Sequence, residues 1–281
     1  MKKIVMAMIM LVMFFITVFT QQKIVMAKQP QNILRIWPIG REDAFPREAG
    51  GPGFVVEKNS RYLLIDAPPT LGIVLQKIGL NPLDFDQVVI THLHNDHVGG
   101  LVEFIQFRTI ALKNQERWRE AGYFTKIAKE KIKIVLPGSA KNSEWWLALE
   151  KLINLNVPYD WKEFHEIVFR TDGEMVIDSW NFEFRATDHE PECSAIKIEK
   201  KIAISGDTCY HPDLENWLSQ DAEIIFHELG FAGPHTTLLD LLKISANLPA
   251  NVQLFFYHLP YPAIPLLGDK YRVVECRWYD L

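Results

Sequence analysis

The segment Thr91-His92-Leu93-His94-Asn95-Asp96-His97 decides the expected fold of this 281-residue chain. Three histidines and one aspartate fall within six residues, after a buried-type strand at 87–90 and before Gly99-Gly100. In an extended segment residues 92 and 94 point to the same side, so two imidazoles can bind one ion. A turn then lets Asp96 and His97 face a neighbouring ion. Because zinc favours imidazole nitrogen and carboxylate oxygen, the segment predicts a metal site.

Short strands and helices alternate on both sides of this segment. Strands rich in Ile, Val, Leu and aromatic residues are predicted at 32–37, 53–58, 62–66, 87–90, 131–136, 166–170, 182–186, 195–199, 201–205, 222–227 and 252–258. Helices are predicted at 71–80, 143–155, 211–219 and 237–244, and the charged stretch 100–133 has a helical pattern. This order predicts an α/β fold, an αββα sandwich of two mixed β-sheets with external helices.

Residues 1–27 have the pattern of a secretory signal peptide. Lys2 and Lys3 precede an apolar run at 4–19 that contains one polar residue, Thr17, and the small residue Ala27 precedes Lys28. The run is short for a membrane span, which needs about 20 residues. We expect cleavage after Ala27, a domain of residues 28–281 without a stable membrane span, and a periplasmic or secreted protein. An uncleaved N-terminal anchor and a buried helix are the alternatives.

Composition restricts the class of partner. The chain is 48% hydrophobic and 23% charged, which is ordinary for a globular protein, and its length fits one large domain or two small ones. Without residues 1–27 it holds 27 basic and 35 acidic residues, a net charge of −8. An acidic domain binds nucleic acid polymers poorly, so we expect a small-molecule substrate. The three cysteines are too few for a disulfide framework, although one bridge remains open.

Further along the chain, three polar positions complete a pattern. The chain resembles the metallo-β-lactamase superfamily, whose signature is His-x-His-x-Asp-His after a buried strand, then a lone His, an Asp and a last His. The later members are His189 in Ala186-Thr187-Asp188-His189, Asp207 in Ser205-Gly206-Asp207-Thr208, and His258 in Phe256-Tyr257-His258-Leu259. The resemblance runs from about Ile33 to about Pro260.

The resemblance implies a dinuclear metal-dependent hydrolase. It assigns His92, His94 and His189 to one metal, Asp96, His97 and His258 to the second, and Asp207 to both. We expect two divalent ions per chain, with zinc favoured and manganese or iron also compatible. Two such ions lower the pKa of water from about 15.7 towards 7, so no serine or cysteine nucleophile is needed. Asp66, at a strand end, would orient a ligand imidazole, unless it is a plain strand-end aspartate.

Two later pieces indicate a branch of the superfamily. His227-Glu228 and His235-Thr236-Thr237 resemble the phosphodiesterase side, which includes ribonuclease Z-like tRNA 3′-processing nucleases. Glu228 would orient His235, and His235 would be the general acid for the leaving group, although the spacing between the pieces is short. Asp96 is the other expected catalytic residue, because it would lie close to the attacking water. The commonest zinc β-lactamases have Cys where Asp207 stands, which disfavours antibiotic hydrolysis.

The favoured function is hydrolysis of a small phosphodiester, such as a cyclic nucleotide. Cleavage of a lactone, β-lactam, thioester or sulfate ester is the alternative on the same site, and a non-catalytic metal-binding protein is the third hypothesis. The basic and aromatic stretch 103–133 is either a lid that attracts an anion or a solvated helical face with an apolar underside. His165 and His211 match no motif and are expected to be structural or surface residues. The oligomeric state is not predicted.

Overall fold

The computed structural model describes residues 33–43, 50–122, 127, 129–230, 233–259 and 272–281. The chain divides into two units, Met1–Ile33 and Leu34–Leu281, and the described strands and helices belong to the second. The predicted signal peptide at 1–27 lies outside the described residues, so it stays a prediction, as does the domain boundary at residue 28. No helix in the described ranges is long and apolar enough to cross a bilayer.

The first sheet contains seven strands and is mixed. Its strands run in the order β13 (Tyr279–Asp280), β1 (Leu34–Gly40), β2 (Gly53–Lys58), β3 (Arg61–Ile65), β4 (Phe85–Val89), β5 (Ile132–Pro137) and β6 (His165–Arg170). Pairs from β13 to β3 are antiparallel, and pairs from β3 to β6 are parallel. The segment at 91–97 therefore follows β4, which lies among the parallel strands of this sheet.

The second sheet contains six strands and is also mixed. Its order is β12 (Gln253–Tyr257), β11 (Ile224–Glu228), β10 (Ile202–Ile204), β9 (Ser194–Ile198), β8 (Trp180–Ala186) and β7 (Gly173–Ile177). β10, β11 and β12 are parallel, whereas β9 is antiparallel to both β8 and β10. As a consequence, β8, β10, β11 and β12 all end at the same edge of the sheet.

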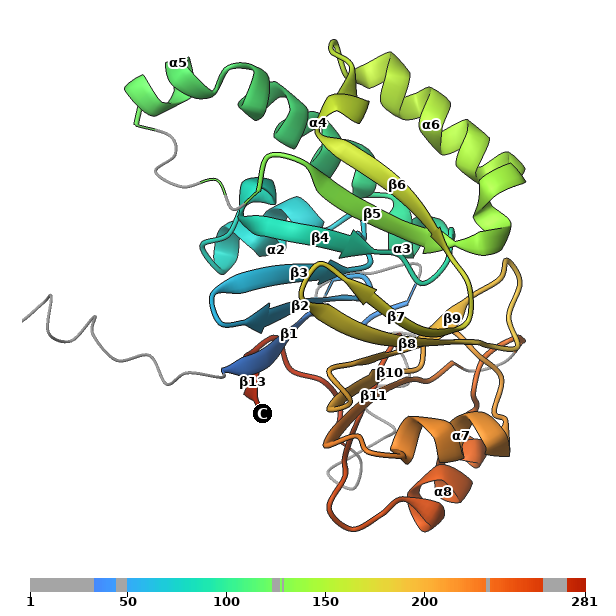
Figure 1. The fold of residues 1–281 in the computed structure, drawn as a ribbon. Helices are drawn as coiled ribbons and strands as arrows, with labels where there is room; N and C mark the ends of the chain where they lie inside the picture. Colours follow the sequence, from blue (N-terminus) through green and yellow to red (C-terminus); the bar gives the residue numbers. More distant parts are fainter. Residues whose placement is uncertain (1–32, 44–49, 123–126, 128, 231–232, 260–271) are drawn as a thin grey trace, which may run out of the picture. The chain divides into compact units, whose positions relative to one another are not determined.

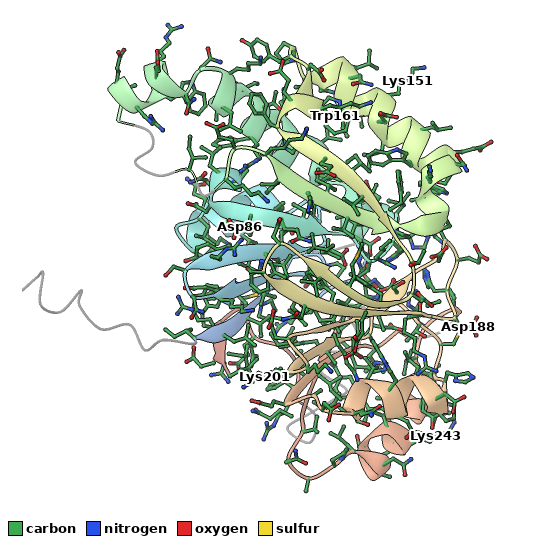
Figure 2. All side chains as sticks on the ribbon, viewed as in Figure 1. Asp86, Lys151, Trp161, Asp188, Lys201 and Lys243 are labelled. Carbon is green, nitrogen blue, oxygen red and sulfur yellow. The ribbon has the colours of Figure 1, made fainter. Side chains whose placement is uncertain are left out.

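Helices cover the outer faces of the two sheets (Figure 1). α2 (Leu71–Lys77), α4 (Leu101–Lys113) and α6 (Glu144–Asn156) pack on the first sheet, and α7 (Pro212–Ser219) and α8 (Leu238–Asn247) pack on the second. The other described helices are short: α3 (Asn95–Val98), α5 (Gln115–Glu120) and the 3-10 helices η1 (Pro82–Asp84), η2 (Gly138–Asn142) and η3 (Trp161–Glu163). Charged side chains such as Lys151 of α6 and Lys243 of α8 lie on the solvent side of these helices (Figure 2).

Three apolar layers hold the sandwich together. One fills the space between the sheets and includes Phe54, Ile196 and Phe226, all nearly fully buried. The second lies between the first sheet and its helices and includes Trp161, labelled in Figure 2. The third lies between the second sheet and helices α7 and α8. These layers confirm the predicted α/β sandwich of two mixed sheets with external helices.

Local sequence accounts for most of the elements, with two strands missed. Ser143 caps α6, because its Oγ accepts the Trp146 N–H at 3.1 Å. Glu199 and Lys200 adopt φ values of 53° and 57°, which make the tight turn between β9 and β10. The prediction missed β7, in which Glu174 and Val176 face solvent, with Val176 69% exposed, and the apolar run Met175-Val176-Ile177 does not alternate with polar residues. It also missed β13, which is two residues long.

The first part of the basic stretch at 103–133 belongs to the folded body. Phe104, Ile105 and Leu112 of α4 are buried against the first sheet or its neighbours. The Arg108 guanidinium is fully buried and donates to the backbone carbonyls of Pro82 and Glu130. These contacts fit the helical face with an apolar underside. Residues 123–126 and 128 lie outside the described ranges, so the lid hypothesis is left open for them.

Candidate metal centre and active site

Strand ends from both sheets meet at one place. β4 ends at Val89, three residues before His92, and α3 begins at Asn95 with His94 at its N-cap. On the second sheet, His189 follows β8, Asp207 follows β10 and His258 follows β12. Because these three strands end at the same edge, residues far apart in the sequence come together without long loops.

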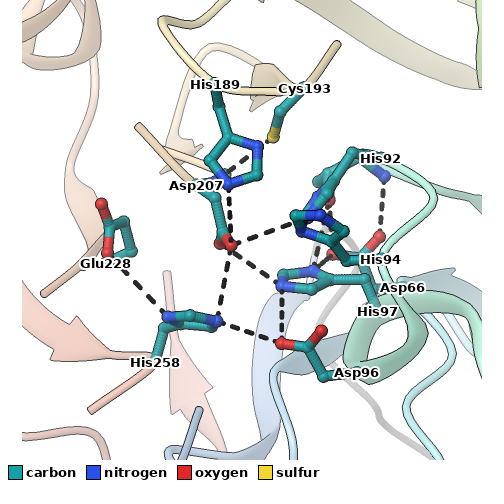
Figure 3. A network of polar contacts seen from close by, with 12 residues as sticks. Asp66, His92, His94, Asp96, His97, His189, Cys193, Asp207, Glu228 and His258 are labelled. Carbon is teal, nitrogen blue, oxygen red and sulfur yellow. Dashed lines mark hydrogen bonds and ion pairs between the residues drawn. The ribbon is translucent and has the colours of Figure 1, made fainter. Parts of the chain in front are cut away.

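The seven predicted ligands form two neighbouring groups. Ligand atoms of His92, His94, His189 and Asp207 lie within 4.8 Å of one another, and so do those of Asp96, His97 and His258. Asp207 lies at the centre (Figure 3). Its carboxylate oxygens are 3.6 Å from His92, 3.3 Å from His97, 3.8 Å from His189 and 3.4 Å from His258. The structure thus brings the seven together, while their binding of metal stays a prediction.

The donor atoms in these groups fit cations. Nε2 of His97, Nε2 of His189 and Oδ1 of Asp207 are buried and make no hydrogen bond. Buried polar atoms without a partner are costly, and clustered imidazole and carboxylate atoms are the donors that divalent transition metals prefer. His/Asp sets of this composition can hold a dinuclear centre.

The charges in the centre favour an ionised carboxylate at its middle. Burial alone would raise the pKa of Asp207, but the charges of His258 and His97 hold it well below its ordinary value. Burial lowers the pKa of His92 well below its usual range, and the positive charge of His97 adds to that effect. The two low pKa values favour the ionised carboxylate of Asp207 and the neutral imidazole of His92, the forms in which these groups bind a metal.

A buried carboxylate orients the segment at 91–97. One oxygen of Asp66 accepts the Thr91 N–H at 2.7 Å, and the other accepts the Thr91 hydroxyl and Nδ1–H of His97, both at 2.8 Å. Asp66 itself lies at φ 59°, just after β3. With its Nδ1 occupied, His97 presents Nε2 to the centre. The predicted orienting role of Asp66 is therefore visible in its contacts.

Two residues that the sequence analysis did not use support Asp207. The Cys193 sulfur accepts the Asp207 N–H at 3.3 Å. Gly206 lies at φ 60°, and a Cβ there would fall 2.7 Å from that sulfur. Only glycine fits such a position, so the glycine of Ser-Gly-Asp-Thr is the sequence feature that could have indicated this tight turn before Asp207. Cys193 is thus a buried support for the turn.

Arg170 joins the two sheets behind the centre. This fully buried side chain extends from the end of β6 and donates to Ser194 Oγ at 2.6 Å and to the Thr91 carbonyl at 3.0 Å. Its guanidinium also lies over the Phe184 ring, 4.6 Å from the centroid. The sequence carried no signal for this role, because an arginine at a strand end is ordinary until the fold brings its partners together.

Glu228 holds His235 above the centre. Glu228 accepts the backbone N–H groups of Thr208 at 3.2 Å and Thr236 at 2.8 Å, and its second oxygen lies 3.2 Å from Nδ1 of His235. Burial alone would lower the pKa of His235, but the hydrogen bond and charge of Glu228 raise it above its ordinary value. The His235 ring stacks on His258, with centroids 5.1 Å apart.

Gly230 makes room for His235, which also lies within ligand distance of the centre. A Cβ on Gly230 would fall 2.5 Å from Cβ of His235, so any side chain there would displace the imidazole. His235 forms a further group with Asp207 and His258, whose ligand atoms are within 4.8 Å of one another. The geometry therefore suits a proton donor at the edge of the centre.

The remaining histidines make contacts outside the predicted ligand groups. His227 faces Glu215 of α7 at 3.0 Å, on the opposite side of β11 from Glu228, as alternation along a strand requires. His165 is buried and bonded to the Trp161 carbonyl, and His211 caps α7. These contacts match the structural interpretation of His165 and His211. All three cysteines lie in described ranges and are free, so the structure contains no disulfide.

Comparison with known proteins agrees with this architecture. The family described as "Anti-Pycsar protein Apyc1" matches residues 34–265. The anti-Pycsar protein Apyc1 of Saccharibacillus brassicae is 24% identical over 233 residues, which cover 78% of this chain and 88% of that protein. The Dictyostelium discoideum cAMP/cGMP-dependent 3′,5′-cAMP/cGMP phosphodiesterase B is 25% identical over 72% of this chain, which is only 18% of that protein. The Bacillus subtilis metallo-β-lactamase fold protein YhfI is similar in structure, with a TM-score of 0.66, 16% identity, and coverage of 89% of this chain and all of that one.

Proposed function

The chain belongs to the anti-Pycsar Apyc1 family and is a metal-dependent hydrolase of the metallo-β-lactamase fold, and on that premise we propose that it opens the phosphodiester of a 3′,5′-cyclic nucleotide. The observation that carries this proposal is His235, held by Glu228 beside Asp207 and His258. A ribose oxygen is a poor leaving group and needs a proton, which a histidine of raised pKa can supply. The phosphodiesterase relative supports the same substrate class.

The two groups of residues divide the chemistry between them. His92, His94, His189, Asp96, His97, His258 and the shared Asp207 would hold two divalent ions, zinc in preference to manganese or iron. When bound, such ions supply Lewis acidity and water of lowered pKa. Asp66 fixes His97, and Asp96, 3.1 Å from His258, lies where it can accept a proton from the attacking water.

The reaction balances with one water. The water oxygen forms a bond to phosphorus, one ribose oxygen leaves, and His235 donates its proton to that oxygen. The water's proton passes to the carboxylate of Asp96 and then to solvent. The product is a nucleoside monophosphate, and both active residues return to their starting protonation states after His235 is reprotonated.

The experiment is a substrate panel on the metal-loaded protein. We expect hydrolysis of cyclic AMP, GMP, CMP or UMP, with a nucleoside monophosphate identified by mass spectrometry, and loss of turnover after chelation. The panel includes an RNA oligonucleotide, a lactone, a β-lactam, a thioester and a sulfate ester. Turnover of one of these with no attack on cyclic nucleotides would contradict the proposal. A metal-loaded protein inert on every member would favour the non-catalytic hypothesis.

We further propose export, on the basis of residues 1–27 alone. Mass spectrometry of the protein recovered from its natural host should show Lys28 as the first residue. A soluble cytoplasmic protein that begins at Met1 would contradict this proposal without affecting the hydrolase assignment.

A further inference from the structure

One exposed tryptophan stands beside the metal centre. The Trp145 ring lies 6.4 Å from the His94 ring, centroid to centroid, with the two planes 80° apart. Trp145 is 56% exposed, and of the eight tryptophans, all in described ranges, it is the only one so open to solvent. His94 is half-buried and belongs to the first group of predicted ligands. An exposed aromatic ring therefore lies beside one of the predicted ligands of the centre where a phosphate would be bound.

The backbone beneath this ring is held in place. Ser143 closes the first turn of α6 by accepting the Trp146 N–H at 3.1 Å and donating to the Ala140 carbonyl at 3.0 Å. Trp146, the next residue, is buried and packs edge-on against Phe169 at 6.3 Å. Because its neighbour Trp146 is anchored in the core, Trp145 projects from a fixed helix end. Binding of a ligand ring to Trp145 would therefore cost little further backbone entropy.

The chemistry of this position fits a planar base. An aromatic side chain stacks on any nucleobase, because every base has a π-face, and it needs no hydrogen bond to do so. The edge of Trp145 or His94 is directed at the other ring, and the two planes are nearly perpendicular. Because Trp145 is 56% exposed, part of its indole ring remains accessible to a ligand whose phosphate lies at the histidine cluster. Singly exposed apolar residues are common, and Trp145 differs from them because its ring lies beside that of His94.

We propose that Trp145 stacks on the nucleobase of the substrate and so raises the affinity of the enzyme for cyclic nucleotides. This inference rests on the proposed function. Purines, which offer the larger stacking surface, should bind more tightly than pyrimidines. Trp145 acts on binding, and the metal centre and His235 act on the phosphodiester.

Stacking should affect KM more than kcat. The base is remote from the bond that breaks, so its stacking is equally strong in the ground state and the transition state. Trp145→Ala should raise KM for cyclic AMP by about 5- to 150-fold, the effect typical of one stacked base. Trp145→Phe should recover part of that loss. The matched control is Leu155→Ala, because Leu155 is 75% exposed at the other end of the same helix.

The test compares a base-bearing substrate with a base-free one and adds a binding measurement. Steady-state kinetics on cyclic AMP and on the 3′,5′-cyclic phosphate of 1-O-methylribose are measured for the wild type and the three variants, together with metal content. A slowly hydrolysed phosphorothioate analogue of cyclic AMP is then titrated into metal-loaded protein. We expect it to quench tryptophan fluorescence in the wild type and in Leu155→Ala, with the quenching lost in Trp145→Phe.

The outcomes separate this inference from the proposed function. A selective rise in KM for cyclic AMP, with metals retained, supports base stacking. Equal losses on both substrates, or a fall in metal content, would mean that Trp145 merely shields His94, and unchanged kinetics would equally overturn the inference. If the wild type hydrolysed no cyclic nucleotide, the proposed function would fail. The base site would then be tested by fluorescence alone. Quenching of Trp145 by adenosine monophosphate but not by ribose 5-phosphate would support base stacking, and any other result would overturn it.

Discussion

Residues 91–97 supply four predicted ligands from one segment after β4, whereas His189, Asp207 and His258 come from three separate strand ends of the second sheet. Asp66 ties the contiguous half down through three hydrogen bonds of 2.7–2.8 Å. In the dispersed half, the Asp207 turn is held by several partners: the Thr187 hydroxyl donates to the Asp207 carbonyl at 2.7 Å, Glu228 accepts the Thr208 N–H at 3.2 Å, and the Cys193 sulfur accepts the Asp207 N–H at 3.3 Å. The contiguous half is thus oriented by a single carboxylate, and the dispersed half depends on residues that the packing of the sandwich brings together.

The largest expected effect comes from the residue that both halves share. Asp207→Asn removes the charge that faces four histidines, so metal content should fall from about two ions per chain towards zero and turnover of every ester should disappear. Asp96→Asn should remove only the ion of the second group, and it should also abolish turnover because it disturbs the attacking water. Elemental analysis and rates of both variants make the comparison. Two metals retained in Asp207→Asn would contradict the shared role.

The next effect concerns the leaving group. His235→Ala should keep both metals and lose about 10²–10⁴-fold in rate on a substrate with an alkoxide leaving group. On an activated nitrophenyl phosphodiester, whose leaving group needs no proton, the loss should be much smaller. Gly230→Ala should reproduce part of this pattern, because its methyl group would displace His235. Equal losses on both esters, with metals retained, would mean that His235 positions the substrate instead of donating a proton.

A smaller effect tests the two supports directly. Asp66→Asn weakens the hydrogen bonds that orient His97, and loss of such a partner typically costs about 10- to 100-fold in metal affinity. Cys193→Ala removes one weak sulfur contact and should cost less than Asp66→Asn. Competition with a chelator measures both affinities. A greater loss in Cys193→Ala would reverse the comparison and show that the Asp207 turn is the weaker point of the centre.

The same difference explains what the sequence could predict. The contiguous half is visible as spacing, because residues 92 and 94 share a face of an extended segment and a glycine pair ends the turn. His189, Asp207 and His258 are unremarkable one by one, and only the resemblance to a family connected them. The alternating and apolar patterns likewise predicted most strands, whereas the largely exposed β7 carried no such pattern.

Contacts made across the sandwich could not be predicted. Arg170 binds Thr91, 79 positions away in the sequence, and Ser194 of the other sheet. The position of Trp145 beside His94 similarly depends on how α6 packs on the first sheet. A single sequence encodes these partners only through the finished fold, so nothing in the local pattern distinguishes Arg170 from an ordinary surface arginine.

The smallest expected effect contrasts two buried histidines outside the predicted ligand set and alters stability alone. His227 donates from both ring nitrogens, to the Glu228 carbonyl at 2.7 Å and to Glu215 at 3.0 Å, so it is a cation. Burial alone would lower the pKa of His227, but the charge of Glu215 raises it to about 9. His165 has one partner, the Trp161 carbonyl, and its Nε2 makes no hydrogen bond. Burial lowers the pKa of His165 to about 3, so it is neutral.

The two histidines should therefore respond to pH with opposite signs. An unfolded histidine titrates near 6.5, so the stabilisation from His227 is complete below about pH 6.5 and is lost as the pH rises towards 9. The contribution of His165 is complete above about pH 6.5 and is lost as the pH falls towards 3.

Urea unfolding at pH 6.5 and 8 of the wild type, His227→Gln and His165→Gln measures the first sign. Because the ligand histidines titrate alike in all three proteins, their effect cancels in the differences. The advantage of the wild type over His227→Gln should shrink by on the order of 2 kcal/mol from pH 6.5 to 8, whereas its advantage over His165→Gln should rise slightly, by about 0.4 kcal/mol. Parallel alkaline losses in the wild type and His227→Gln would show that the buried pair with Glu215 is not charged.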